Sequence, residues 1–225
     1  MQYLSNLQVT RTLESSILND LQANFAALGQ HYQLEATIIT TQQQLLFKQH
    51  QEPHRHYHNL SHLYNLLSLV EQFKSYIQQP RLLELVIWYH DSVYDPASKE
   101  NEAQSAQWAI EIWQSYLNTP TLQQLEAYIL ATTKHFPKTD DEDERLFLDF
   151  DLSILAAEPT IYQAYSQAIQ EEYTTVYPLG LYRKGRQQVL KAFLERSNIY
   201  YSTLFVQQYE AAARSNLIEE LQLLQ

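Results

Sequence analysis

Histidines crowd into one short stretch of the sequence, RHYHNLSHL, which spans residues 55–63. Three of the chain's eight histidines, His56, His58 and His62, lie within these residues. Imidazole titrates near neutral pH and is the commonest metal-binding side chain of proteins. On a helix, His58 and His62 would share one face because they are four residues apart. The stretch therefore predicts metal binding and acid–base chemistry.

Two later segments carry further metal-binding side chains in apolar surroundings. His90 and Asp91 end the most apolar stretch of the chain, RLLELVIWYHD. Asp149 and Asp151 lie within LFLDFDLSIL, where an isolated buried carboxylate would be costly to desolvate. A divalent cation removes that cost by neutralising the carboxylate, and imidazole with carboxylate suits Mn, Fe, Ni or Zn. The residues alone do not decide between Asp149 and Asp151 as a ligand.

Each of these residues has a simpler explanation when it is considered singly. His62 could be a hydrogen-bonded core histidine, and His90-Asp91 could be a helix end with a salt bridge. Asp151 could cap the helix that follows it, and Asp149 could pair with Arg145. One bound metal accounts for three segments together, whereas each alternative accounts for only one.

The elements that must position these side chains are predicted to be helices. The chain has 225 residues, 45% of them apolar, with three glycines and seven prolines. So few glycines disfavour tight hairpins and glycine-rich phosphate loops, and nearly every interval between prolines has helical periodicity. We expect a single all-α domain, residues 1–225, of about nine or ten helices.

The expected helices follow from the spacing of apolar residues. The first is predicted to stop at Gly29, and the segment 81–91 is predicted to be central and buried because it is apolar nearly all round. An acidic loop is expected over 140–144. The full set of expected helices covers about 13–28, 34–49, 57–79, 81–91, 100–117, 121–135, 144–158, 159–176, 184–196 and 198–224.

Composition narrows the class of protein and its partners. The formal net charge of −11 disfavours a nucleic-acid polymer or an anionic membrane as a partner. Cysteine is absent, which excludes disulfides, thiolate zinc sites and thiol catalysis. The N-terminal residues lack signal-peptide features, and no apolar run is long enough for a membrane span. We therefore expect a soluble cytoplasmic protein whose oligomeric state the sequence leaves open.

The motifs YHNLSHL, WYHDSVYD, LATTKH and DFDLSIL together resemble the HD-domain metal-dependent phosphohydrolase superfamily. Later segments, EEYTTVYP, YRKGRQQVL and AARSNLIEEL, resemble an uncharacterised bacterial subgroup of predicted HD phosphohydrolases, so that the resemblance covers nearly the whole chain. YHN and DLS are also similar to their counterparts in cyclic-nucleotide phosphodiesterases. The resemblance implies an HD-like helical fold and hydrolysis of a small phosphate ester, with a nucleotide as one candidate.

The resemblance also implies a role for each motif residue. His58 would donate a proton to the leaving group, and Asp91 could orient the attacking water as well as bind the metal. Where the phosphodiesterases have a further histidine, this chain has Tyr94, which weakens the case for a full second metal site and for a cyclic nucleotide. The implied ligands of the first metal are His62, His90, Asp91 and Asp151.

Basic side chains are needed to hold a substrate phosphate. Lys134 and His135 lie between the second and the last ligand segments, and Arg183 and Arg186 belong to the densest basic run of the chain. We expect these four residues to bind substrate, with Arg55 as a weaker candidate.

Two other functions remain open from the sequence. Some HD-like sites hold two irons and activate oxygen, and His135 and Asp149 could supply the additional ligands. Alternatively, the metal could be a structural staple or part of a ligand sensor in a protein without catalytic activity.

Overall fold

The computed structural model describes residue 4 and residues 6–224. Over these residues the protein is all-helical and has no β-strand, which confirms the predicted fold class. None of the described helices has the length and hydrophobicity that a membrane-spanning segment requires. The helices are α1 (Ser15–His31), α2 (Ala36–His50), α3 (Leu60–Gln72), η1 (Lys74–Tyr76), α4 (Pro80–Tyr89), α5 (Asn101–Trp113), α6 (Thr119–Ala131), α7 (Glu142–Asp151), η2 (Leu152–Ala156), α8 (Pro159–Thr174), α9 (Leu179–Glu195) and α10 (Thr203–Leu223).

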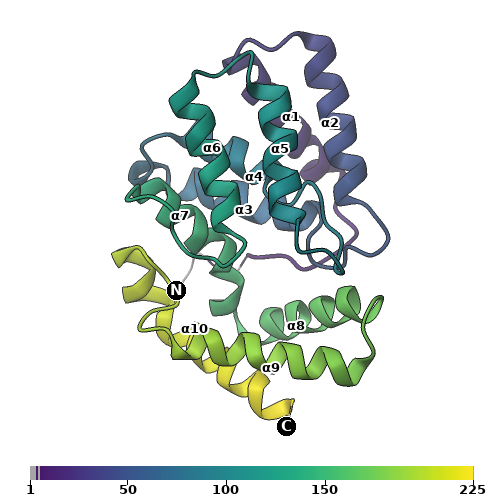
Figure 1. Cartoon of the computed structure of the whole chain (residues 1–225), viewed down its shortest axis with the longest axis vertical. Coiled ribbons are helices and arrows are strands. Elements are labelled where there is room, and N and C mark those ends of the chain that lie inside the picture. Colours follow the sequence, from purple (N-terminus) through teal and green to yellow (C-terminus); the bar gives the residue numbers. More distant parts are fainter. Residues whose placement is uncertain (1–3, 5, 225) are drawn as a thin grey trace.

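Helix α4 is the centre of the larger of two groups of helices. Pro80 starts it, in the first helical turn where proline is favoured, and every residue from Leu82 to Tyr89 is buried. It packs against α1, α3, α5 and α6. Figure 1 shows α1–α7 gathered in this group, with α8, α9 and α10 lying together along its lower side. The apolar stretch that the sequence predicted to be central is therefore the core helix.

Three helix ends place the predicted metal-binding residues. Asn59 caps α3 by accepting a hydrogen bond from the backbone N–H of Ser61, which puts His62 in the first turn. His90 follows the last residue of α4, and Asp151 is the last residue of α7. Because α3 packs against both α4 and α7, these ends meet.

Carboxylates hold many of the loops in place. Five of them each accept hydrogen bonds from two consecutive backbone N–H groups, and four of the five are fully buried. Carboxylates are strong acceptors for backbone N–H groups, which lets them replace missing secondary-structure bonds. The pairs are Asp143 with Gln78 and Gln79, Glu144 with Lys138 and Thr139, Asp149 with Tyr201 and Ser202, Glu172 with Tyr57 and His58, and Glu210 with Ile199 and Tyr200.

Two expectations about acidic residues are therefore wrong. The segment 140–144 is not simply an acidic loop, because α7 begins at Glu142 and the side chains of Asp143 and Glu144 point inward. Asp149 does not pair with Arg145, whose guanidinium instead contacts Glu142 and Asp140. Buried backbone N–H groups offer these carboxylates partners that a sequence pattern does not show.

Gly29 does not end α1, as the sequence predicted, but lies inside it. The helix continues to His31, and Gln33 adopts the left-handed conformation that closes it, with φ of 60°. A Cβ atom on Gly29 would lie 2.5 Å from Cγ1 of Ile39 in α2. Glycine at position 29 allows α1 and α2 to approach each other closely. It does not end α1, which continues to His31.

Gly29→Ala is expected to destabilise the protein by about 1–3 kcal/mol, because the added methyl group overpacks the α1–α2 contact. Urea unfolding followed by circular dichroism measures the change. The matched control is Gly185→Ala in α9, where a Cβ would meet no atom within 4 Å. That control should gain about 0.5–1 kcal/mol from helix propensity. Equal stabilities for the two variants would contradict the close-approach explanation.

Candidate metal centre

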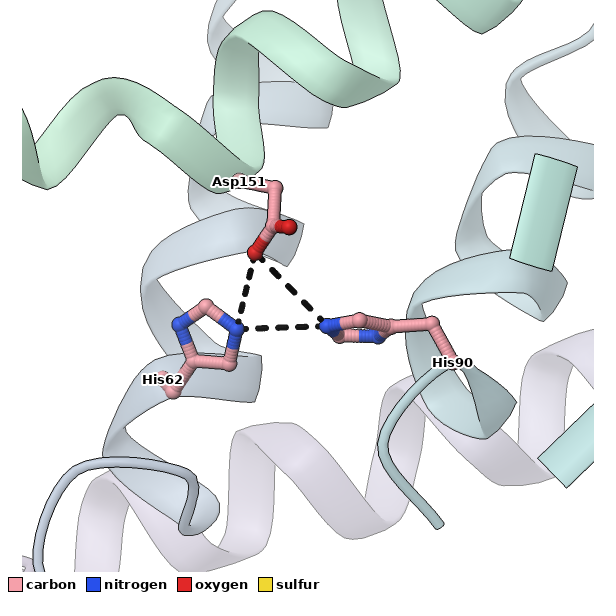
Figure 2. A group of neighbouring side chains, drawn as sticks. All are labelled: His62, His90 and Asp151. Atoms are coloured by element: carbon pink, nitrogen blue, oxygen red, sulfur yellow. Dashed lines mark hydrogen bonds and ion pairs between the residues drawn. The ribbon is translucent and has the colours of Figure 1, made fainter. Parts of the chain in front are cut away.

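His62, His90 and Asp151 converge on one point between the ends of α3, α4 and α7 (Figure 2). The Nε2 atom of His62 lies 3.2 Å from Nε2 of His90 and 3.3 Å from Oδ1 of Asp151. The Nε2 atom of His90 lies 3.8 Å from the same Asp151 oxygen. Within the described part of the chain, these three residues form the group of ligand atoms close enough to share one metal ion.

The Asp91 carboxylate lies beside two members of this group. Its Oδ2 lies 3.0 Å from Nε2 of His90 and 3.7 Å from Nε2 of His62. A cation with ligands at about 2.1 Å in tetrahedral geometry separates neighbouring ligand atoms by about 3.4 Å. Five of the six distances among the four side chains run from 3.0 to 3.8 Å, close to that separation, but Asp91 falls outside the group whose ligand atoms all lie within 4.8 Å of one another. His62, His90 and Asp151 therefore form a group that could hold a metal ion, with the Asp91 carboxylate beside the two histidines.

Hydrogen bonding orients His90 as a ligand. Its Nδ1–H donates to the backbone oxygen of Ile87 at 2.9 Å, which turns Nε2 toward the cluster. Burial alone would lower the pKa of His90, but the carboxylates of Asp91 and Asp151 raise it to about 9. Burial lowers the pKa of His62 below its ordinary value, which favours the neutral imidazole that metal binding requires.

His135 lies against the metal-binding group, although the sequence placed it among the substrate ligands. Its Nε2 is 3.0 Å from Oδ2 of Asp151, the oxygen that faces away from His62 and His90. His135 has a left-handed backbone, φ 46°, in the turn that closes α6. Its backbone oxygen accepts hydrogen bonds from Arg196 and from the Tyr201 hydroxyl. These contacts hold His135 where it can orient the Asp151 carboxylate.

His58 forms a charged pair with Glu172 beside the cluster. Its Nδ1 lies 2.7 Å from Oε2 of Glu172, and the two imidazole centroids of His58 and His62 are 5.9 Å apart. Burial alone would lower the pKa of His58, but Glu172 raises it above its ordinary value. Burial would raise the pKa of Glu172, but His58 and two backbone N–H groups lower it to about 2. Glu172 therefore favours the protonated form of His58.

Two further histidines, His56 within the stretch 55–63 and His54 just before it, anchor this loop. Nδ1 of His56 lies 2.9 Å from Oε2 of Glu171, and Nε2 of His54 lies 2.9 Å from the backbone oxygen of Tyr94. The Tyr94 hydroxyl in turn donates to Glu172 at 2.7 Å. The crowding of histidines thus serves two purposes, because some position the loop and others form the candidate site.

Of the four predicted substrate ligands, His135 contacts the candidate metal-binding group, whereas the other three have different surroundings. Lys134 is exposed beside His135, and Arg183 is exposed on α9. Arg186 is buried, and its Nε and Nη2 atoms donate to the two carboxylate oxygens of Glu220 at 2.8 and 2.9 Å. A guanidinium engaged in this way cannot also bind a substrate phosphate, so the prediction for Arg186 is corrected to a structural role.

Asp149 and Asp151 have different partners in the structure. The Asp149 carboxylate accepts the backbone N–H groups of Tyr201 and Ser202 at 2.7 and 2.8 Å, so it anchors the start of α10. Burial raises the pKa of Asp149 to about 7, although these hydrogen bonds lower it. Asp151 faces the histidines instead, and it is the aspartate that fits a ligand role.

Glu172 is the main residue of the site that sequence reasoning missed. It lies 114 residues after His58, and no local motif joins the two. A signal was nevertheless present, because Tyr165, Ala168, Ile169 and Glu172 follow helical spacing and are all buried. A carboxylate on the buried face of a helix requires a partner, and a search for one among the histidines would have led to this pair.

No protein-family model matches the chain, and no curated protein or solved structure matches it either. The resemblance of its motifs to the HD superfamily therefore stays a prediction.

Proposed function

We propose that the protein is a metal-dependent phosphohydrolase that acts on a small phosphate ester. One observation carries the proposal: three candidate metal ligands surround one point with Asp91 beside two of them, and an imidazole whose pKa is raised, His58, lies next to this group. Metal-assisted hydrolysis needs this combination, because the attacking water must be activated while the leaving oxygen receives a proton.

Each side chain has a defined part in the proposed reaction. His62, His90, Asp91 and Asp151 would hold the cation, which when bound polarises a phosphoryl oxygen and makes water more acidic. His58 keeps Nδ1–H on Glu172 and presents Nε2–H, from which a proton passes to the departing alkoxide. Glu172 stabilises the protonated imidazole before the transfer. His135 holds the outer oxygen of Asp151 in place.

Two observations favour this function over the alternatives. In the di-iron alternative, Asp149 would be a metal ligand. Its carboxylate instead accepts hydrogen bonds from two backbone N–H groups at the start of α10. A purely structural metal would be sealed from water, whereas the side chains of Asp91 and Asp151 remain 16% and 10% exposed. The carboxylate side of the cluster is therefore not completely sealed.

Elemental analysis together with a phosphate-release assay tests the proposal. The protein is loaded separately with Mn, Fe, Ni and Zn and is assayed on phosphate monoesters, phosphodiesters and nucleotides. We expect about one or two equivalents of metal and turnover, both lost in His62→Ala. The control His31→Ala, an exposed residue at the end of α1, should retain both. No bound metal with any of the four ions would refute the proposal, as would equal turnover in the two variants.

Glu172→Gln is expected to lower turnover by about 10- to 100-fold and to shift the alkaline fall of the pH–rate profile to lower pH. The sign follows from the pKa of His58, which Glu172 holds above its ordinary value against the effect of burial. Without that carboxylate, His58 loses its proton at lower pH and stops acting as an acid. Steady-state rates from about pH 5 to 9 measure the shift.

The control for this prediction is Glu171→Gln, which alters the contacts of that carboxylate with His56 and Gln167. It should leave the alkaline limb in place. If the profile of Glu172→Gln coincides with that of the wild type, His58 does not depend on Glu172 for its proton.

A further inference from the structure

Arg55 is a buried cation that joins two loops of the candidate site. Its side chain lies between the loop that leads to His58 and the segment that follows α4, and the residue is only 1% exposed. Nη1 donates to the backbone oxygens of His58 at 3.1 Å and of Asp91 at 2.6 Å. Nη2 donates to the backbone oxygen of Ser92 at 3.2 Å. One guanidinium thus contacts the main chain of the candidate acid and of a candidate metal ligand.

The other contacts of Arg55 fix the guanidinium itself. Nε donates to Oε2 of Glu52 at 3.2 Å, and the guanidinium carbon lies 5.3 Å from the centroid of the Tyr94 ring. The Asp91 and Ser92 oxygens follow the C-terminal end of α4, where the helix dipole favours a positive charge. With these donors engaged, Arg55 is not available to bind substrate phosphate, the weaker role that its position in the sequence had indicated.

We propose that Arg55 is a positioning residue that sets the distance between His58 and Asp91. The inference rests on the proposed function, in which His58 donates the proton and Asp91 lies at the cation. A planar guanidinium can reach three carbonyl groups in a fixed geometry, whereas a lysine ammonium is a compact charge on a flexible stem. Displacing a reacting group by about 1 Å can cost about 10²-fold in rate.

The metal-binding group itself depends less on Arg55. His62 and Asp151 lie within α3 and α7, and His90 is oriented by its own bond to Ile87. Arg55 contacts the backbone rather than the carboxylate of Asp91. Loss of the guanidinium should therefore change the relative placement of the two loops more than the capacity to bind metal.

Hydrogen–deuterium exchange tests the link between the loops without requiring turnover. In Arg55→Lys we expect exchange at least about tenfold faster in both 55–60 and 91–95. The matched control is Arg81→Lys, since Arg81 contacts Glu84 and is 41% exposed. Unchanged exchange in 91–95 of Arg55→Lys would overturn the proposal, because the guanidinium would then not connect the two segments.

Steady-state kinetics on the metal-loaded protein test the consequence for catalysis. For Arg55→Lys we expect kcat to fall by about 10²-fold, with KM within about threefold and metal content unchanged. In Arg55→Ala, added guanidinium at millimolar concentration should restore part of kcat. A cavity of about 140 Å³ borders Arg55, and through it the added guanidinium could reach the place of the missing side chain. His58→Ala should not be rescued in this way.

The outcomes separate this inference from the proposed function. A wild-type protein that binds metal without hydrolysing any phosphate ester would refute the proposed function, while the exchange experiment would still decide whether Arg55 links the loops. A wild type that turns over, beside an Arg55→Lys variant with unchanged kcat, would overturn the positioning role alone. Loss of bound metal in Arg55→Lys would also overturn it, since the arginine would then support the metal site as a whole.

Discussion

Asp151→Asn is expected to lower phosphate release by about 10³-fold and to remove most of the bound metal. A bound cation contributes several kcal/mol of transition-state charge stabilisation, and each ~1.4 kcal/mol corresponds to a tenfold change in rate. Asparagine has nearly the same size as aspartate, but it lacks the negative charge that Asp151 places beside His62 and His90. Elemental analysis and initial rates at saturating metal measure the two losses.

Asp149→Asn provides the matched control, because it makes the same chemical change two residues away. Asp149 binds the backbone of Tyr201 and Ser202 and does not face the cluster. This variant should be less stable but should keep its metal and its turnover per folded molecule. If Asp149→Asn lost its metal while Asp151→Asn retained it, the assignment of the two aspartates would be reversed.

Arg186→Met is expected to lower the free energy of unfolding by about 3–5 kcal/mol, because it leaves the buried carboxylate of Glu220 without its cation. Arg186 and Glu220 are 8% and 6% exposed, and Glu220 also accepts hydrogen bonds from Tyr162 and Ser166. Urea unfolding at pH 7 measures the loss. Arg183→Met, three residues earlier on an exposed face of α9, should change stability by less than about 0.5 kcal/mol.

The double variant Arg186→Met with Glu220→Leu distinguishes a broken ion pair from a packing defect. Replacing both members of a buried pair with apolar side chains is often close to neutral. We expect the double variant to recover most of the stability that the single variant loses. If it is no more stable than Arg186→Met alone, the single variant owes its loss to packing and not to an uncompensated charge.

Helical periodicity was sufficient to predict the fold class and most of the helices. The central position of α4 followed from its apolar sequence, since a helix that is apolar on every face must be surrounded by others. The end of α1 was not predictable from Gly29, because glycine permits both a helix stop and a close helix contact. Only the position of Ile39 in the folded chain distinguishes these two uses.

The candidate site was predictable where its residues lie at helix ends within short motifs. The structure brings His62, His90 and Asp151 together and places Asp91 beside the two histidines, while their role as metal ligands stays a prediction. Arg186 was not identified correctly as a substrate ligand. The number of basic residues in a segment does not show whether a given arginine is exposed or paired. Arg183 and Arg186 belong to one basic run, yet one is exposed and the other is buried against Glu220.

Five carboxylates each accept hydrogen bonds from two backbone N–H groups of another segment. In a chain without cysteine, these reversible bonds connect segments as disulfides do in other proteins. Some join segments that are far apart, since Glu172 and Tyr57 are separated by 115 residues and Asp149 and Ser202 by 53. Closing such long loops is entropically unfavourable, so these bonds should form late in folding, after the helices have packed. Unlike disulfides, they need no oxidant and respond to protonation. Protonation of Glu172 would therefore weaken both a long-range contact of the fold and the contact with His58 in the candidate site.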